Sequence, residues 1–385
     1  MKAQEKQRQL QPWQEERIKK FQKQGIIFRL ATSDDAQALT DFHNQEFGTQ
    51  RSVQQWLWEY QTYAPDKSVF SIAVKDNQIL ATDGDIPIYM EIGGKTRLAA
   101  KEESWLCLPE YRGTGLIQAL GNWRRKYGLR EHFEMSFGLS TNDKIHGRFG
   151  FGTVFRNIQI WTRPGNLRTI LTIRLRDHMT HWHGFSSFKF IASTGKLVVR
   201  ALIRGKRGSI PPIYTRSGYE LRKGQIPIEH LQDMHQRLLS NNDDIIWIKY
   251  DKNYLDWRIR QHPVKKYDEY QIYKEDVMCA YAFVTEQEGE VCISDLVSED
   301  TLATSLLLNT ILNEYTNRAV QFRFLGNPMD RLSLDLFRQL PQFGFSLATK
   351  WILNTNARKG AALSTEFLKI HNWHVNGLWT EGFLY

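Results

Sequence analysis

The chain has 385 residues and a net charge of +9, and this length favours two domains. With 41% hydrophobic and 24% charged residues, the composition is that of a soluble globular protein, which excludes wholesale disorder, collagen and a coiled-coil rod. No apolar run approaches the roughly 18 residues that a membrane-spanning helix needs. The polar N-terminus has no signal-peptide core, and the three scattered cysteines favour a reducing cytoplasm as the location.

The basic charge is concentrated in residues 153–223, which hold 14 Lys and Arg residues against two acidic residues. Shifts in pattern divide the chain into four predicted segments. These are a charged helical extension (1–25), a block of alternating helices and strands (26–164), a basic linker segment (165–225) and a second alternating block (226–385).

Hydrophobic periodicity predicts the elements of the first block in chain order. A strand at Ile26–Leu30 precedes a helix that Thr32 caps and that runs toward Phe47. The later elements are a Trp-rich helix at 52–62, strands at 69–74, 79–91 and 96–108, a helix with its apolar face at 116–127, a strand at 133–138, a short helix at 142–149 and strands at 151–162.

The second block repeats this order of elements. We expect strands at 270–273, 277–285 and 290–297, a helix at 301–318 capped by Ser298, a strand at 320–325, a helix at 330–340 and strands at 346–353 and 366–385. The shared order predicts two copies of one fold, each an α/β unit (α+β) built on a mixed sheet.

The loop from Leu108 to Leu116 reads Leu-Pro-Glu-Tyr-Arg-Gly-Thr-Gly-Leu and joins a strand to a helix. Gly113 and Gly115 lack Cβ atoms, so the backbone can approach a ligand closely there. Consecutive amide N–H groups at a helix N-terminus hold anions, and Arg112 adds a positive charge. The geometry suits a pyrophosphate.

Together with the strand, helix and strand around it, this loop resembles that of the GNAT family of acyl-CoA-dependent N-acyltransferases, which reads Arg/Gln-x-x-Gly-x-Gly/Ala. Arg112 and Gly115 match the pattern, while Ile117 stands where the family usually has Gly or Ala. The doubled layout is similar to tandem GNAT proteins such as the Fem-type aminoacyl transferases and N-myristoyltransferase. The resemblance therefore implies two GNAT-like domains in tandem, of which the second is degenerate.

The resemblance also implies acetyl-CoA, or another acyl-CoA, as co-substrate. Its pyrophosphate would bind the loop, and its pantetheine arm would pair with the strand before the loop, because that strand splays from the next one. The residues so assigned are Trp105, Leu106, Cys107, Leu108, Arg112, Gly113, Thr114, Gly115, Leu116 and Ile117, with Asn142 beside the arm.

Two carboxylates on the strand that enters the loop are candidates for the general base that acyl transfer to an amine needs. Alternation places Glu102 and Glu103 on opposite faces, and a bulge would invert their parity. The family's usual position for the base favours Glu103. His146 falls where the family often has the tyrosine that acts as the general acid. A histidine can donate a proton near neutral pH.

The acceptor side is predicted from the neighbouring strand and helix. Asp83, Asp85 and Tyr89 are candidates for binding a cationic amine, and the resemblance places Trp56 and Glu59 on a helix that lines the acceptor cleft. Because Trp56 and Trp58 are two positions apart, they cannot share one helical face, and we expect at least one of them in the core.

We therefore expect an acyl-CoA-dependent N-acyltransferase that moves an acetyl or other short acyl group to a primary amine of a small molecule, with an amino sugar as one candidate. Direct attack is expected, because no cysteine is placed to form a covalent intermediate. A Fem-type tRNA-dependent aminoacyl transferase and a non-enzymatic GNAT-like scaffold are the alternatives. In the second block, the acids of Val297–Thr301 stand where a pyrophosphate would lie, and we infer that this half does not bind CoA.

The basic segment leaves its partner open. We favour a solvated linker surface over an anionic membrane or tRNA, and nothing in the pattern indicates DNA. His178, His181 and His183 lie within it, but no carboxylate or cysteine completes a metal site, so we expect no metal.

Overall fold

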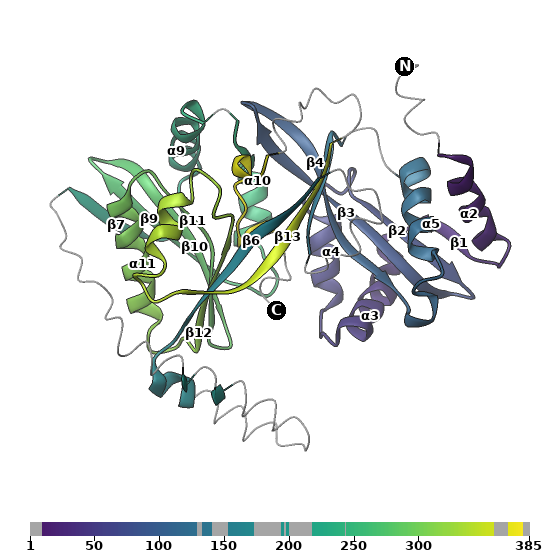
Figure 1. Cartoon of the computed structure of the whole chain (residues 1–385), viewed down its shortest axis with the longest axis horizontal. Helices are drawn as coiled ribbons and strands as arrows, with labels where there is room; N and C mark the ends of the chain where they lie inside the picture. Colours follow the sequence, from purple (N-terminus) through teal and green to yellow (C-terminus); the bar gives the residue numbers. More distant parts are fainter. Residues whose placement is uncertain are drawn as a thin grey trace.

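The computed structural model describes residues 10–128, 133–140, 153–172, 194–195, 198–199, 218–242, 244–357 and 369–379. These residues form a mixed α/β structure in which one twisted, mixed sheet runs through the whole molecule and helices pack on both of its faces (Figure 1). The fold class predicted from the sequence is confirmed. Among the described helices, none is both long enough and apolar enough to cross a membrane.

The helices and strands follow the predicted order closely in the first half of the chain. The helices are α2 (Pro12–Gln22), α3 (Ala36–Phe47), α4 (Val53–Gln61), α5 (Leu116–Trp123), α9 (Ile228–Ser240), α10 (Lys252–Leu255), α11 (Thr301–Tyr315) and α12 (Leu334–Gln339). The strands are β1 (Ile27–Leu30), β2 (Val69–Lys75), β3 (Gln78–Ile92), β4 (Lys95–Cys107), β5 (Met135–Ser140), β6 (Thr153–Pro164), β7 (Tyr219–Lys223), β8 (Ile246–Ile248), β9 (Tyr267–Lys274), β10 (Val277–Gln287), β11 (Glu290–Ser298), β12 (Gln321–Gly326) and β13 (Ser346–Ala357).

In the first half, β1 to β4 form an antiparallel meander and β4 then pairs in parallel with β5. Helices α4 and α5 cover opposite faces of this sheet. A Cβ at Gly84 would meet Phe70, which packs against Trp56 of α4, whereas one at Gly121 of α5 would lie 3.4 Å from the Asp83 carboxylate. Because Asp83 and Gly84 are consecutive in β3, the two helices must lie on different sides of it.

The second half repeats this pairing pattern. Strands β9, β10 and β11 are antiparallel, β11 pairs in parallel with β12, and α11 connects the two as α5 connects β4 and β5. The repeated order of elements predicted from the sequence is thus visible in the strand pairing. The four-segment division of the chain stays a prediction.

The two halves exchange strands at the centre of the sheet, whose order there is β5-β13-β6-β12. Strand β13, from the end of the chain, pairs with β5 of the first half, and β6 pairs with β12 of the second half. The sequence places strand 151–162 in the first block, yet its hydrogen bonds go to β12 and β13. The sheet is therefore continuous across the predicted boundary at residue 164.

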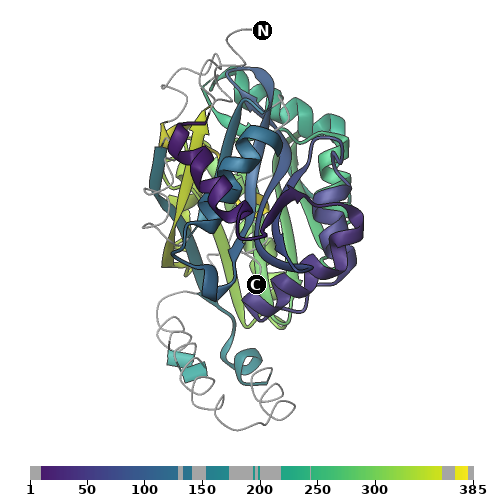
Figure 2. The same cartoon turned by 90° about the vertical axis from the view of Figure 1, so that its right-hand side faces the viewer.

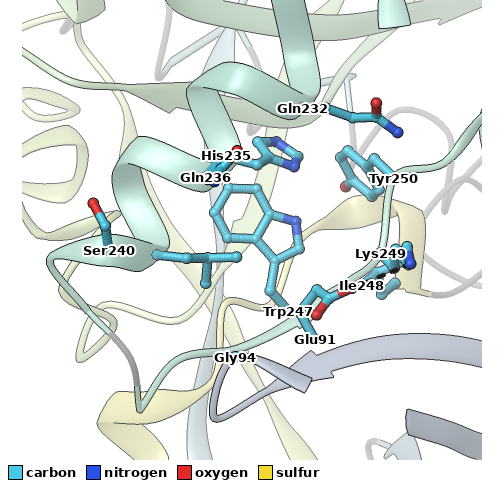
Figure 3. A pocket seen from close by; sticks show the side chains of 11 residues that line it. Glu91, Gly94, Gln232, His235, Gln236, Ser240, Trp247, Ile248, Lys249 and Tyr250 are labelled. Atoms are coloured by element: carbon cyan, nitrogen blue, oxygen red, sulfur yellow. Dashed lines mark ion pairs between the residues drawn. The ribbon is translucent and has the colours of Figure 1, made fainter. Parts of the chain in front are cut away.

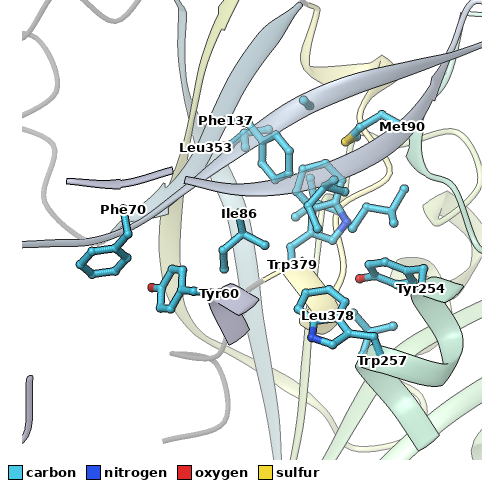
Figure 4. Close-up of a cluster of buried hydrophobic side chains, with 14 of the residues drawn as sticks. Tyr60, Phe70, Ile86, Met90, Phe137, Tyr254, Trp257, Leu353, Leu378 and Trp379 are labelled. Atoms are coloured by element: carbon cyan, nitrogen blue, oxygen red, sulfur yellow. The ribbon is translucent and has the colours of Figure 1, made fainter. Parts of the chain in front are cut away.

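The main hydrophobic core also spans both halves. It brings Phe70 and Phe137 of the first half together with Trp257 and Trp379 of the second (Figure 4). Trp58 stacks on Trp257, and each indole N–H donates to the other residue's carbonyl oxygen, at 2.9 and 2.8 Å. A second core lies between α11, α12 and the sheet of the second half. This packing favours one cooperative unit.

Three details differ from the sequence predictions. The cap of α11 is Asp300, whose carboxylate accepts from Ala303 N at 2.7 Å, and Ser298 only supports it. The predicted strand 366–385 is absent from the described residues 369–379, which form short helical turns and one isolated bridge. The prediction lacks the elements between 219 and 255, among them β7, α9 and β8. Of these, β7 and β8 are too short to show a clear period.

Candidate active site

The loop between β4 and α5 has the backbone conformation that its glycines allow. Gly113 and Gly115 have φ of +80° and +93°, values that side chains rarely adopt. A single turn at Pro109–Tyr111 leads into the loop, and α5 begins at Leu116 with Gly115 as its N-cap. A Cβ at Gly113 would have no atom within 4 Å, so the loop is open to solvent there.

Several N–H groups of this loop are available to a ligand. Within the described part of the chain, the amides of Gly113, Gly115 and Ile117 donate to no other residue. Leu116 N lies 3.3 Å from the Thr114 hydroxyl, which itself donates to Tyr111 O at 2.7 Å. Unsatisfied amides at a helix N-terminus attract an anion, so this loop can hold one; that it binds a pyrophosphate stays a prediction.

The side chain of Arg112 has partners within the protein, whereas the sequence predicts only a positive charge for the anion. Its Nε donates to Cys107 O at 3.0 Å, and its terminal nitrogen pairs with Glu46 of α3 at 2.5 Å. The arginine therefore ties α3 to the end of β4, and it shapes the loop as well as adding charge. Its side chain is 60% exposed, so one side of the guanidinium still faces solvent.

Strands β4 and β5 separate directly before the loop. They pair only at Ala99–Lys101, while β4 stays paired with β3 as far as Cys107. The segment Trp105–Leu108 thus runs beyond the ladder with β5, as the resemblance to GNAT proteins implies for the strand that receives the pantetheine arm. A bulge lies in the same stretch, where Ser104 has a φ of +52°.

Glu102 directly follows Lys101, the last residue of β4 that pairs with β5. Burial raises the pKa of its carboxyl group to about 7; Arg124 opposes the rise, and Asp85 and Asp83 reinforce it. Across the opening, a Cβ at Gly138 of β5 would lie 4.0 Å from the Glu102 carboxylate oxygen. A carboxyl group with this pKa can exchange a proton near neutral pH.

Glu103 lies on the opposite face of β4, so the parity predicted before the bulge holds. Its carboxylate pairs with Lys101 at 2.5 Å, and the lysine is buried. Tyr60 of α4 lies on this side and bonds to the Ser104 hydroxyl at 2.7 Å. Glu103 therefore faces α4, while Glu102 faces α5.

Asp83 and Asp85 form ion pairs inside the protein. Both are buried, and both pair with Arg124, which begins a π-helical turn after α5; the Arg124–Asp83 distance is 3.0 Å. Burial raises the pKa of Asp83 to about 6 against the pull of Arg124. Because their charge is directed inward toward Arg124, they are not placed to bind an acceptor amine, contrary to the prediction. Arg124 was missed, since the sequence shows two consecutive arginines with no sign of which turns inward.

The other predicted acceptor residues have varied surroundings. Trp56 is buried against Phe70, and Trp58 is buried too, so both tryptophans belong to the core. Glu59 is buried in an ion pair with Arg51. Tyr89 is partly exposed, and its hydroxyl accepts from Lys67 at 2.5 Å, so it is the one of these side chains that solvent reaches.

Two predicted site residues, His146 and Asn142, lie outside the described residues, as do His178, His181 and His183. In the described part of the chain, no group of three His, Cys, Asp or Glu side chains is arranged to hold a metal ion.

The corresponding point of the second half is closed. The N-terminus of α11 is capped by the carboxylate of Asp300, which takes the place of an anion. Strands β11 and β12 separate after Ile293, and the segment 369–379 fills the opening. His374 of that segment bonds to Asp295 at 3.3 Å and to Asp330 at 2.6 Å.

A cavity of about 420 Å³ lies elsewhere, between α9, β8 and the end of β3 (Figure 3). His235, Trp247 and Tyr250 form its inner wall, and no residue of the β4–α5 loop lines it. The candidate site is therefore the β4–α5 loop with its open amides, and we assign the cavity no part in it.

The comparisons with known proteins agree with this geometry. The family model described as "Acetyltransferase (GNAT) domain" matches residues 28–154. No curated protein matches the sequence.

Similar solved structures include a probable N-acyltransferase of unknown function from Enterococcus faecalis (TM-score 0.56, 10% identity, 87% of this chain and 73% of that one). A GCN5-related N-acetyltransferase from Anabaena variabilis has a TM-score of 0.51 and 12% identity over 85% of this chain and 72% of that one. N-myristoyltransferase from Saccharomyces cerevisiae, solved with bound myristoyl-CoA, has a TM-score of 0.55 and 11% identity over 86% and 82%. At such identities the likeness concerns the fold.

Proposed function

We propose that the protein is an acyl-CoA-dependent N-acyltransferase with one working site in its first half, where residues 28–154 match the GNAT acetyltransferase family model. The acyl group is acetyl or another short acyl group, and the acceptor is a primary amine of a small molecule. The observation that carries the proposal is the loop of free amides at Gly113, Gly115 and Ile117, placed where β4 leaves β5.

The residues present suit an acyl-CoA. The open amides of the loop bind its pyrophosphate, and the part of β4 beyond Lys101 receives the pantetheine arm. The thioester supplies the acyl group. Cys107, at the end of β4, takes no covalent part, because burial raises the pKa of its thiol to about 11 and keeps it protonated.

The reaction proposed is direct attack. The amine nitrogen forms a C–N bond to the thioester carbonyl carbon, and the C–S bond breaks. Glu102 accepts the proton that the amine loses, and the thiolate leaves and is protonated. A backbone N–H of β4 stabilises the tetrahedral oxyanion. Burial raises the pKa of Glu102, and the charges of Arg124, Asp85 and Asp83 modulate it.

No structural observation favours the alternative of a tRNA-dependent aminoacyl transferase. Its support in the sequence is the basic segment, most of which lies outside the described residues. The scaffold alternative requires the loop to have lost its function, and the open amides do not support such a loss.

The test is acyl transfer itself. Purified protein is incubated with acetyl-CoA and a panel of primary amines including amino sugars, and free thiol and acylated product are measured together. We expect thiol release that depends on an amine and yields the acylated amine in equal amount. If thiol appears at the same rate without any amine, or not at all across the panel, the proposal is wrong.

The base is identified by matched substitutions. Glu102→Gln is expected to lower kcat by at least about 100-fold, the usual range for loss of a general base. Glu290→Gln, on β11 of the second half, is the control and is expected to retain activity. In the unsubstituted protein kcat/KM should rise with pH through about 7, as Glu102 loses its proton. If Glu103→Gln abolishes activity and Glu102→Gln does not, Glu103 is the base.

A further inference from the structure

The N-terminal helix α2 packs directly against α5, the helix that begins at the glycine loop (Figures 1 and 2). Ile18 and Phe21 of α2 are buried beneath it. Gln14 donates to Asn122 at 3.3 Å, and Glu15 pairs with Lys126 at 2.5 Å. Residues 10–27 precede the match to the GNAT family model, so this helix lies outside the matched residues.

One side chain of α2 reaches the loop. The Cδ and Nε atoms of Arg17 each lie 3.7 Å from the position that a Cβ would take at Gly115, the N-cap of α5. The guanidinium carbon lies 5.2 Å from the centre of the Trp13 ring, one turn earlier on α2. The indole therefore holds the guanidinium beside the loop by a cation–π contact.

The charge of Arg17 has no carboxylate partner in the part of the chain that the structure describes. Among the residues that the structure describes, Arg17 forms no ion pair and no hydrogen bond. Arg112, on the loop itself, is engaged by Glu46, and Arg124 by Asp83 and Asp85. Arg17 is thus a partly buried cation at the anion-binding end of α5, with no acidic partner among the described residues.

We propose that Arg17 binds a phosphate group of the acyl-CoA at the loop and so completes the phosphate site from outside the GNAT domain. The inference rests on the proposed function. The amides of Gly113 and Gly115 hold the phosphate oxygens from one side, and the guanidinium closes the site from the side of α2. An arginine can bind a phosphate with two parallel charge-assisted hydrogen bonds and brings a full positive charge, which the backbone amides lack.

The experiment compares acetyl-CoA binding to the full chain and to Arg17→Gln by titration calorimetry at two salt concentrations. Lys19→Gln is the control, because it removes the same charge two positions along α2 and therefore on another face. We expect Arg17→Gln to raise Kd about ten-fold and to weaken its dependence on salt. Lys19→Gln should stay within about two-fold of the unsubstituted protein.

A second pair of ligands separates a binding role from a structural one. Acetyl-pantetheine carries the thioester without phosphates, so its turnover should be equal in Arg17→Gln and the unsubstituted protein. Acetyl-3′-dephospho-CoA then identifies the phosphate: the ten-fold effect persists if Arg17 holds the pyrophosphate and disappears if it holds the 3′-phosphate.

The outcomes that overturn the inference are distinct from those that overturn the proposed function. Equal acetyl-CoA affinity of Arg17→Gln and the unsubstituted protein refutes the role of Arg17 and leaves the loop site intact. Equal loss of acetyl-CoA and acetyl-pantetheine turnover also refutes it, because the substitution then acts through the fold. If the unsubstituted protein binds no acetyl-CoA, both proposals are wrong.

Discussion

Replacing Arg124 with methionine tests the buried charge cluster beneath the site. Arg124 is the shared partner of Asp83 and Asp85, both of which are buried, and it also lowers the pKa of Glu102. Methionine keeps the aliphatic bulk but removes the charge. Breaking a buried pair in this way costs about 3–5 kcal/mol, because the remaining carboxylates are left without compensation.

The cost should depend strongly on pH, because a carboxyl group can escape burial of its charge by taking a proton. The pKa of Asp83 is about 6 and that of Glu102 about 7 even with Arg124 present, and both rise without it. The folded state of Arg124→Met then binds more protons than the unfolded state above pH 4, so its stability falls as pH rises. We expect a loss of about 4 kcal/mol at pH 8 and less than half of that at pH 5.

Urea unfolding at the two pH values measures the effect through the midpoint and slope of the transition. Arg331→Met is the matched control, because Arg331 forms an exposed ion pair with Asp244, and its loss should change stability by less than about 0.5 kcal/mol at either pH. The acid limb of the activity profile should also move to higher pH in Arg124→Met. An equal cost at pH 5 and pH 8 would refute the reasoning.

Three further predictions concern the second half and its junction with the first. Asp300→Ala should cost about 1 kcal/mol through the lost cap of α11 and leave acetyl-CoA stoichiometry unchanged; a second binding site in calorimetry would contradict this. The two carboxylates around His374 outweigh the effect of burial and raise its pKa to about 10, so its contribution to stability is full below pH 6.5 and lost as pH rises through 10. His374→Gln should therefore lower the melting temperature more at pH 6 than at pH 10. An equal decrease at both pH values would contradict this prediction. Trp58→Phe should cost about 1–3 kcal/mol by leaving the Trp257 carbonyl without its donor, with a single calorimetric transition retained; two separate transitions would show that the halves unfold independently.

Local signals were enough to predict the loop and its surroundings. Gly113 and Gly115 have the positive φ that glycine permits, and the strand and helix around them lie where the periodicity places them. The opposite faces of Glu102 and Glu103 also follow from alternation, because the bulge at Ser104 comes after both residues. These features depend on residues close together in the sequence.

Features that depend on distant contacts could not be predicted. The exchange of β6 and β13 between the halves leaves the pattern of each strand unchanged, because a strand alternates in the same way whichever neighbour it pairs with. Asp83 and Asp85 looked like amine ligands, since the sequence does not show that Arg124 turns inward to meet them. Arg17 lies in an N-terminal helix whose position on α5 is set by tertiary packing.

Titration calorimetry of the full chain with acetyl-CoA tests the central claim most directly. We predict one site per chain, abolished by Gly115→Glu, which places a charged side chain at a φ of +93° in the phosphate loop. Gly224→Glu is the control, because Gly224 also has a positive φ but lies away from the loop, between β7 and α9, with no atom within 4 Å of a Cβ there. This variant should bind acetyl-CoA normally. Binding that survives Gly115→Glu, or no binding by the unsubstituted protein, would contradict the assignment of the loop.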